Sequence, residues 1–405
     1  MSTLIICDPG CHNEFGHNID SVIRYYDRVK SEFDRIVVVV AGKVERFHKL
    51  GYNVEEVSML YPTLYLDTFN QRVKNKAFQW GYDFVRANLG KPLHKSWCRT
   101  AKKQIREIIK RETASDPDVT VYFPSADYYF VLGCAELLVE ESAKFHLSIR
   151  FIGVLENASI KRGATRKVLF HTLRKVPAEM LTLQAEAGRY SEYLNFVLNH
   201  EVETIGLPIN QQQIQATDTA SDVPDTYSPE YPLVICLPGK SREDKGGLHV
   251  TKLARSLMDR FGMSVVLRAQ NFNKGSRFHT KSKYLEDLFP NIDYLPSGLP
   301  RDEFEKAIWG ADAVLLPYTP GTYWYRGSAI FFESLEHSKL MIGRGGNAFV
   351  DDHFREGIIR RYYTLDQLNF EVDRILRQGR QKTLEEGREA AEKYRQLNFD
   401  RVSIK

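Results

Sequence analysis

The sequence predicts an α/β protein made of two doubly wound, Rossmann-like domains that face a cleft. Short apolar segments of strand length alternate with amphipathic helical segments, and this alternation occurs twice. A polar stretch with few large apolar residues separates the two series. Apolar strands that alternate with helices are typical of a parallel sheet covered on both faces. A length of 405 residues agrees with two domains.

The first series occupies residues 1–208, the expected N-terminal, acceptor-binding domain. Strands are expected where aliphatic residues run together, and helices where apolar residues recur every three or four positions. The expected strands are residues 4–7, 35–41, 119–123, 147–154, 180–184 and 201–205. The expected helices include residues 17–33, 97–111 and 128–141.

Residues 209–230 form the expected linker, because Gln, Thr, Ser, Asp and Pro dominate there. The second domain, residues 231–385, repeats the alternation, and residues 386–405 are expected to form a helix that can cross back to the first domain. Its strands are expected at residues 233–237, 264–268, 292–295, 313–316 and 340–342. Its helices are expected at residues 248–261, 301–309, 328–337, 365–378 and 383–397.

The composition indicates a water-soluble globular chain, with 43% hydrophobic and 27% charged residues. The longest apolar runs, such as residues 36–41, are too short to span a bilayer, and the N-terminus does not have the pattern of a signal peptide. The five cysteines contain no CxxC pair. Free buried thiols in a reducing compartment are therefore expected, which predicts a cytoplasmic protein.

The most informative segment joins an apolar strand to a helix at residues 312–337. The strand in Asp312-Ala-Val-Leu-Leu-Pro-Tyr318 ends in a loop, and Tyr325-Arg-Gly-Ser328 opens the helix. The first amides of a helix are free and its N-terminal end is positive, so an anion can bind there. Gly327 allows close approach of a ligand, and Ser328 can cap the helix or donate to a phosphate oxygen. Glu333 can accept from a sugar or ribose hydroxyl. The segment predicts a diphosphate cradle.

Two further loops follow strands of the second half. Residues 238–247 contain Gly239, Arg242 and Lys245, whose cations can neutralise phosphates. The loop lacks the Walker A spacing, and a solvated basic turn is the structural alternative. Arg268 ends the next apolar strand, where a charge needs a salt bridge or a ligand. The salt bridge is the favoured interpretation of Arg268.

With these motifs, residues 232–350 resemble the nucleotide-sugar domain of GT-B glycosyltransferases, especially retaining family-4-like enzymes of bacterial polysaccharide and glycolipid assembly. The family's Gly-Arg-(x)n-Lys-Gly loop holds the donor diphosphate, which implies that role for Arg242 and Lys245. In the family's Glu-(x)7-Glu segment, the second Glu binds ribose and corresponds to Glu333. The first Glu of that segment is replaced by Tyr325 in this chain. The departure at Tyr325 leaves the donor sugar and the catalytic detail open. The donor-binding residues expected in all are Gly16, Gly239, Arg268, Leu299, Tyr325, Arg326, Gly327, Ser328 and Glu333.

The first half resembles the family less closely. Residues 8–17 stand where the family has a glycine-rich loop after the first strand, so Gly16 and His17 can face the reacting groups. A surface or capping role is the alternative for His17. Glu156 follows the strand at residues 147–154 and can orient an acceptor hydroxyl. The expected catalytic residues are therefore Arg242, Lys245, His17 and Glu156.

No metal and no separate cofactor are expected. No DxD-type motif is evident, and the family generally uses cationic side chains and helix dipoles to stabilise the leaving group. The resemblance implies that the donor is a UDP- or GDP-linked sugar and that the anomeric configuration is retained.

Two basic segments suggest a further partner. Residues 95–111 contain seven Lys/Arg and one acid, and residues 161–175 contain six Lys/Arg and no acid. Attraction to an anionic membrane surface is one interpretation, and an ordinary solvated helix face is the other. Nucleic acid is not expected, because no binding motif accompanies the charge.

The sequence therefore predicts a cytoplasmic, peripheral, metal-independent glycosyltransferase that acts on a glycan or lipid-linked acceptor. Two alternatives remain open on the same scaffold. One is a nucleotide-sugar epimerase, and the other is a non-catalytic GT-B-like binding protein, which Tyr325 at the usual Glu position favours.

Overall fold

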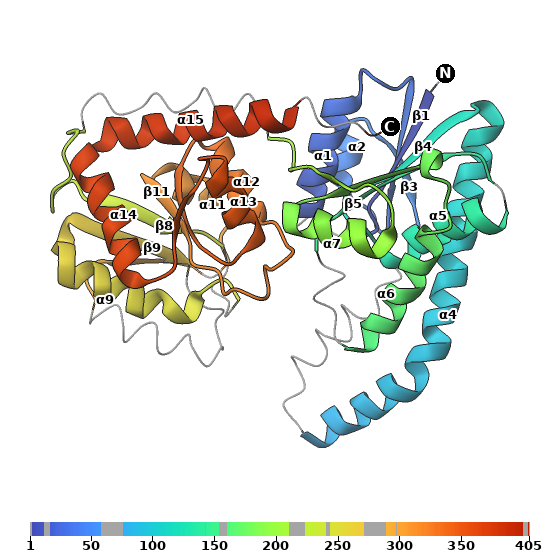
Figure 1. Cartoon of the computed structure of the whole chain (residues 1–405), viewed down its shortest axis with the longest axis horizontal. Coiled ribbons are helices and arrows are strands. Elements are labelled where there is room, and N and C mark those ends of the chain that lie inside the picture. The colour runs from blue at the N-terminus through green and yellow to red at the C-terminus, as the bar shows by residue number, and fades with distance from the viewer. Residues whose placement is uncertain are drawn as a thin grey trace. The chain divides into compact units, whose positions relative to one another are not determined.

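The computed structural model describes residues 2–11, 17–57, 76–141, 143–153, 160–209, 223–239, 244–270, 289–296, 298–399 and 404. The chain divides into two compact units. The first contains Met1–Ala185, Ser191–Thr204 and Ser403–Lys405, and the second contains Glu186–Tyr190 and Ile205–Val402. Each unit holds one sheet, and its helices lie on both sides of it (Figure 1).

The first unit contains a parallel sheet with the strand order β3-β2-β1-β4-β5-β6-β7. The order reverses direction between β1 and β4, which makes the carboxyl ends of these two strands the switch point of the sheet. The strands are β1 (Ser2–Cys7), β2 (Arg35–Val40), β3 (Asn53–Glu56), β4 (Asp118–Phe123), β5 (His146–Phe151), β6 (Leu181–Ala185) and β7 (Glu203–Thr204).

The helices of this unit follow the strands in alternation. They are α1 (His17–Val29), α2 (Glu45–Lys49), α4 (Lys76–Ser115), α5 (Tyr128–Glu140), α6 (Ile160–Leu173) and α7 (Gly188–Leu198), whose first residues belong to the second unit. In the central strands β1, β2, β4 and β5, the first residue is more exposed than the rest, which are buried. Buried runs of this kind are expected for parallel strands that are covered on both faces.

The second unit contains a parallel sheet with the strand order β10-β9-β8-β11-β12-β13. Here the order reverses between β8 and β11. The strands are β8 (Leu233–Leu237), β9 (Val265–Gln270), β10 (Ile292–Leu295), β11 (Ala313–Leu316), β12 (Leu340–Arg344) and β13 (Arg360–Tyr362).

The helices of the second unit are α9 (Val250–Phe261), α11 (Arg301–Trp309), α12 (Ala329–Glu336), α13 (Ala348–Arg355), α14 (Leu365–Gln378) and α15 (Arg380–Phe399). Helices α9 and α14 pack on one face of the sheet and share an apolar core with it. Leu253 and Leu257 of α9 and Val372 of α14 are fully or almost fully buried in that core. Helices α12 and α15 pack together, and Phe331 and Phe332 contact Tyr394 through their rings.

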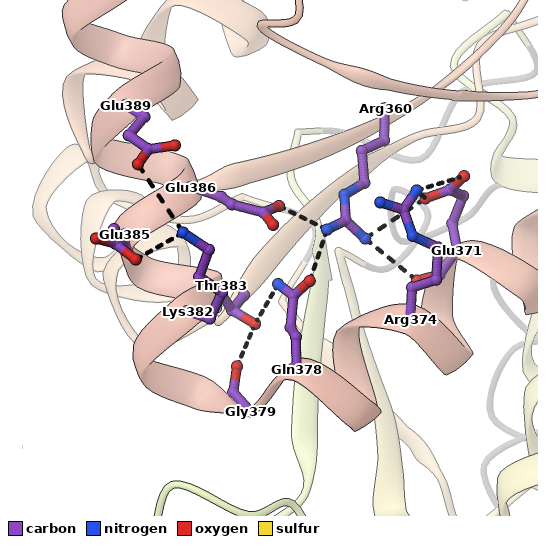
Figure 2. A network of polar contacts seen from close by, with 10 residues as sticks. All are labelled: Arg360, Glu371, Arg374, Gln378, Gly379, Lys382, Thr383, Glu385, Glu386 and Glu389. Carbon is purple, nitrogen blue, oxygen red and sulfur yellow. Dashed lines mark hydrogen bonds and ion pairs between the residues drawn. The ribbon is translucent and has the colours of Figure 1, made fainter.

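A polar network joins the last elements of the chain (Figure 2). Arg360 of β13 pairs with Glu371 of α14 at 3.4 Å and with Glu386 of α15 at 2.5 Å. It also donates to Oε1 of Gln378 at 2.8 Å. One guanidinium therefore joins the edge strand to both C-terminal helices.

The α/β class and the two doubly wound, Rossmann-like units that the sequence predicts are confirmed. Several boundaries differ from expectation. The helix predicted from residue 97 begins at Lys76, the second C-terminal helix begins at Arg380, and β3, β13 and α13 were not predicted.

All five cysteines are free, and each except Cys98 is buried. No helix of the described chain combines the length and apolarity that crossing a membrane requires.

Candidate functional site

The candidate site lies where the strand order of the second unit reverses. The loop after β8 contains Gly239 and Lys245, and the loop after β11 leads to α12. Ligands of open α/β sheets bind outside the carboxyl ends of the strands at such a point. The backbone N–H of Thr319 donates to the carbonyl of Asp244 at 3.0 Å, which holds the two loops together.

Two glycines allow the loop after β8 to close on its neighbours. Gly246 has φ +79° and packs so closely that a Cβ there would lie 2.3 Å from the carbonyl oxygen of Pro317. Gly239 has φ +91°, and a Cβ there would lie 3.2 Å from Nζ of Lys245 and 3.4 Å from Cδ1 of Ile330. A side chain at either position would be strained and would displace the loop. Gly239 and Lys245 thus line one small hollow beside the first turn of α12.

Ser328 is the N-cap of α12. Its hydroxyl is buried, accepts from the backbone N–H of Phe331 at 3.4 Å, and lies 3.1 Å from the hydroxyl of Tyr318. Two roles were expected for Ser328, and the structure shows one of them, the capping of the helix. The first backbone N–H groups of a helix generally lack an intrahelical partner, so the positive end of α12 faces its N-terminal loop.

Tyr318 links the two parts of the site. Its ring lies 5.7 Å from Nζ of Lys245, and its hydroxyl contacts Ser328. The structure therefore brings together three of the predicted residues, Gly239, Lys245 and Ser328, from two loops that are far apart in the sequence. The arrangement places one ammonium group and one helix N-terminus around a small hollow, which suits a phosphate-bearing ligand.

Glu333 lies one turn farther along α12 and is only 6% exposed. Its Oε1 accepts from Nη1 of Arg301 at 2.7 Å, whereas its Oε2 has no hydrogen-bond partner among the described residues. The ion pair with Arg301 offsets the cost of burying the carboxylate. The remaining oxygen can accept one hydroxyl proton. Arg301 did not emerge from the sequence, because a partner 32 residues away leaves no local pattern.

Residues Glu186–Tyr190 also contact the loop before α12, and they were not predicted. Oε2 of Glu186 accepts from the backbone N–H of Gly327 at 3.1 Å, and a Cβ on Gly327 would lie 2.3 Å from that oxygen. Arg189 lies 4.1 Å above the ring of Trp324. Tyr325, at the position where the resemblance implies a carboxylate, packs its ring 5.2 Å from that of Tyr190. The carboxylate nearest to Gly327 therefore comes from Glu186.

Three other predicted donor residues have different surroundings. Nε of Arg268 pairs with Asp293 at 2.7 Å, and its Nη1 donates to the carbonyl of Gly310, so the expected salt bridge is present. The guanidinium of Arg326 lies 5.4 Å from the ring centroid of Tyr323. Leu299 is half-buried just before α11. None of these contacts links the three residues directly to Lys245.

Four predicted residues cannot be placed in the site. Gly16, Glu156 and Arg242 lie outside the described residues, and His17 begins α1 without a described side chain. Their roles stay predictions. Across the described ranges, no group of three His, Cys, Asp or Glu side chains gathers as metal ligands do.

The basic segment at residues 95–111 is partly neutralised within the first unit. Lys102 pairs with Glu136, Glu140 and Glu141, and Arg106 also pairs with Glu141. Arg111 pairs with Glu55 and Glu112. Three of the seven basic residues are therefore engaged by carboxylates, which weakens the expected attraction to an anionic surface.

Comparison with solved structures finds chains of the same architecture. A glycosyltransferase from Rickettsia africae matches with a TM-score of 0.64 at 14% identity, over 98% of this chain and 94% of the other. HepE from Anabaena, in complex with UDP, matches with a TM-score of 0.61 at 12% identity, over 100% and 97%. The UDP-forming α,α-trehalose-phosphate synthase from Burkholderia vietnamiensis matches with a TM-score of 0.62 at 10% identity, over 99% and 95%.

No protein-family model and no curated protein sequence matches the chain. At identities of 10–14%, the structural matches show the shared fold. The resemblance to GT-B glycosyltransferases is thus confirmed at the level of the fold.

Proposed function

We propose that this chain is a glycosyltransferase that moves a sugar from a nucleotide-diphosphate sugar to an acceptor. The observation that supports this most strongly is the grouping of Gly239, Lys245 and the capped N-terminus of α12 at the switch point of the second sheet. Similar structures include a protein in complex with UDP and with UDP-glucose. A UDP- or GDP-linked sugar is the donor class that fits this chemistry.

The proposed mechanism rests on stabilising the leaving group. Negative charge develops on the diphosphate as the glycosidic bond breaks. Lys245 and the positive end of α12 would offset that charge. Arg242 would add a second cation. Oε2 of Glu333 would accept a ribose hydroxyl and so orient the donor.

The finer assignments follow from the resemblance. We propose that transfer retains the anomeric configuration, that it needs no metal ion, and that the acceptor is a glycan or a lipid-linked glycan in polysaccharide or glycolipid synthesis. A lipid-linked acceptor would bring the protein to the cytoplasmic face of a membrane. Arg99, Lys103 and Lys110 are exposed basic residues of the expected patch that remain available for such a surface.

Replacement of Lys245 tests the proposal. Lys245→Ala removes a cation that meets the diphosphate in the transition state, so we expect kcat for donor turnover to fall about 100-fold or more. Turnover is measured as release of nucleoside diphosphate from a panel of UDP- and GDP-sugars with and without mixed glycan and lipid-linked acceptors.

Lys306→Ala is the matched control, because Lys306 is an exposed lysine of α11 outside the hollow. It should retain wild-type turnover. Wild-type kinetics in Lys245→Ala would rule out the proposed role of the loop after β8.

A non-catalytic nucleotide-sugar binding protein is the second candidate. The packing of Tyr325 on Tyr190, where the related enzymes have a carboxylate, favours it. Titration calorimetry with UDP, GDP and their sugars separates the two functions. Saturable binding without transfer to any acceptor would support the binding protein, and conversion of the nucleotide sugar without an acceptor would indicate an epimerase.

A further inference from the structure

A second hollow of the second unit adjoins the one that Gly239 and Lys245 line. Its volume is about 220 Å³, and it lies outside the carboxyl ends of β11, β12 and β13. The lining residues are His249, Lys252, Leu253, Pro317, Arg344, Tyr362, Tyr363 and Leu365. Pro317 also borders the hollow around Lys245, so the two sites are neighbours on one edge of the sheet.

The polar lining of this hollow is positive. His249 directly precedes α9, Lys252 lies in the first turn of that helix, and Arg344 is the last residue of β12. None of the lining residues that the structure describes is Asp or Glu. The charged groups are therefore all positive, and they come from two separate elements that the fold brings together.

These cations differ from most arginines of the same unit. Arg268, Arg301 and Arg360 each pair with a carboxylate. Within the described ranges, neither Lys252 nor Arg344 forms an ion pair. Arg344 is also partly buried, and a partly buried guanidinium without a carboxylate is a group that gains free energy from an incoming anion.

The direction of the pKa shift of His249 follows from this grouping. Burial lowers that pKa below its usual value, and the positive charges of Arg344 and Lys252 lower it further. The three groups are thus close enough to sense one another. Tyr362 and Tyr363 at the end of β13 contribute rings and hydroxyl groups, and no carboxylate occurs among the described residues that line the hollow with His249.

The remaining walls suit a small ligand with an uncharged body. Leu253 and Tyr362 are almost fully buried and belong to the apolar core between the sheet, α9 and α14, whereas Tyr363 is 50% exposed at the rim. The volume is below the range of about 300–1,000 Å³ that is typical of pockets for drug-sized ligands. A whole nucleotide sugar is therefore too large for this hollow.

We propose that this hollow is a second anion site, which binds the phosphate group of a small phosphomonoester other than the nucleotide-sugar donor. Arg344 and Lys252 would bind the phosphate oxygens, His249 would donate a third hydrogen bond when protonated, and Tyr363 would cover the organic part. The proposal rests on the hollow itself and does not depend on the proposed transferase activity.

Binding measurements on two ligands test the proposal. Titration calorimetry with glycerol 3-phosphate should show saturable binding to the wild-type protein. The double variant Lys252→Met/Arg344→Met should lose affinity for it by about 10-fold or more, because two charge-assisted contacts are removed. UDP affinity should stay unchanged in this variant, whereas Lys245→Ala should lose UDP affinity and keep that for glycerol 3-phosphate.

Each outcome has a distinct meaning. If the wild-type protein does not bind glycerol 3-phosphate, or if the double variant binds it equally well, the second site is refuted. Competition between glycerol 3-phosphate and UDP would assign the hollow to the donor site and also refute it. If the wild-type protein binds neither UDP nor GDP but binds glycerol 3-phosphate in an Arg344-dependent manner, only the transferase proposal is refuted. Arg344→Lys retains the charge and is the control for folding.

A pH series with sulfate as the ligand distinguishes a site that includes His249 from nonspecific attraction to positive charge. Sulfate is a dianion at every pH between about 8 and 6. Its affinity should therefore rise as the pH falls over this range, because His249 takes up a proton when the anion binds. His249→Gln should flatten this dependence, and an unchanged slope would contradict the role of His249.

The phosphate can belong to a soluble metabolite or to a lipid headgroup. Vesicles of phosphatidylcholine with phosphatidic acid distinguish the two sources. Arg344-dependent cosedimentation would assign the site to a lipid phosphate, and binding of glycerol 3-phosphate without cosedimentation would assign it to a soluble ligand.

Discussion

Asp8 is a buried carboxyl group at the end of β1, beside the point where the strand order of the first unit reverses. It is 1% exposed and accepts from the backbone N–H of Gly10 at 2.9 Å and from Nδ2 of Asn18 at 3.1 Å. Burial raises its pKa to about 7, although these hydrogen bonds lower it in part, and Asp127 raises it further. Asp8 therefore changes its protonation state near neutral pH.

This shift predicts how stability depends on pH. The folded protein holds the Asp8 proton up to about pH 7, whereas the unfolded chain releases it near pH 4, so stability declines as the pH rises between these values. Asp8→Asn cannot ionise, and it should remove this decline, which is on the order of a few kcal/mol. Urea denaturation at several pH values between 4 and 8 measures the difference.

Asp27→Asn is the comparison for Asp8, because Asp27 is exposed and pairs with Lys30 on the surface. Its difference from wild type should stay within about 0.5 kcal/mol over the same range. A constant difference between wild type and Asp8→Asn at all pH values would contradict a raised pKa for Asp8.

Individual site residues differ in how far the sequence predicts them. Gly239, Lys245 and Ser328 follow strands or open a helix, so local pattern and spacing indicate their position. Glu186 and Arg301 contact Gly327 and Glu333 across 141 and 32 positions. No periodicity within a segment encodes such a pair. The sequence therefore indicates the loops of a site better than the side chains that meet there.

At the level of elements, Arg360 stabilises the end of the second unit (Figure 2). Its side chain is 11% exposed, and its partners Glu371 and Glu386 are 14% and 25% exposed. Removing the guanidinium takes its ion pair from the partly buried Glu386, whereas Glu371 keeps a pair with Arg374 at 3.1 Å. A partly buried charge that loses its partner costs more than the pair itself contributes.

Arg360→Met should therefore lower the free energy of unfolding of the second unit by about 2–4 kcal/mol. Hydrogen exchange of amides in α14 and α15 is the suitable measurement, because it reports on these helices directly. Lys382→Met removes a neighbouring cation whose partners Glu385 and Glu389 are exposed, and it should change stability by less than about 0.5 kcal/mol. Equal effects of the two substitutions would contradict the role assigned to Arg360.

The elements that sequence analysis missed have weak or misleading patterns. Strand β3 reads Asn-Val-Glu-Glu and lies at the edge of its sheet, so it has no apolar run. Strand β13 contains two arginines in three residues. Helix α4 continues through Gly90 and Pro92, which ordinarily disfavour a helix interior. Buried strands such as β2 and β11 were predicted because burial on both faces demands aliphatic side chains.

At the scale of the whole molecule, two doubly wound units give the chain two switch points, and each has charged groups at the carboxyl edge. The first unit places Asp8 there, and the second places Lys245 and the N-terminus of α12. An acceptor site in one unit and a donor site in the other would agree with this division. Under the proposed function, Lys245 and the positive end of α12 would meet the diphosphate of the donor.

Nucleotide binding should therefore stabilise one unit more than the other. UDP or GDP at about 100 times its dissociation constant should stabilise the folded state to which it binds by about 2.7 kcal/mol. Because the proposed diphosphate cradle at α12 belongs to the second unit, amide exchange should slow at residues 244–250 and 317–331. The amides of β1, β4 and β5 should exchange at an unchanged rate. Hydrogen exchange with and without the nucleotide measures both sets of amides. Lys245→Ala should need a higher nucleotide concentration for the same protection, because the diphosphate loses a cation. Protection confined to the first unit would place the nucleotide at the other sheet and exclude the cradle at α12.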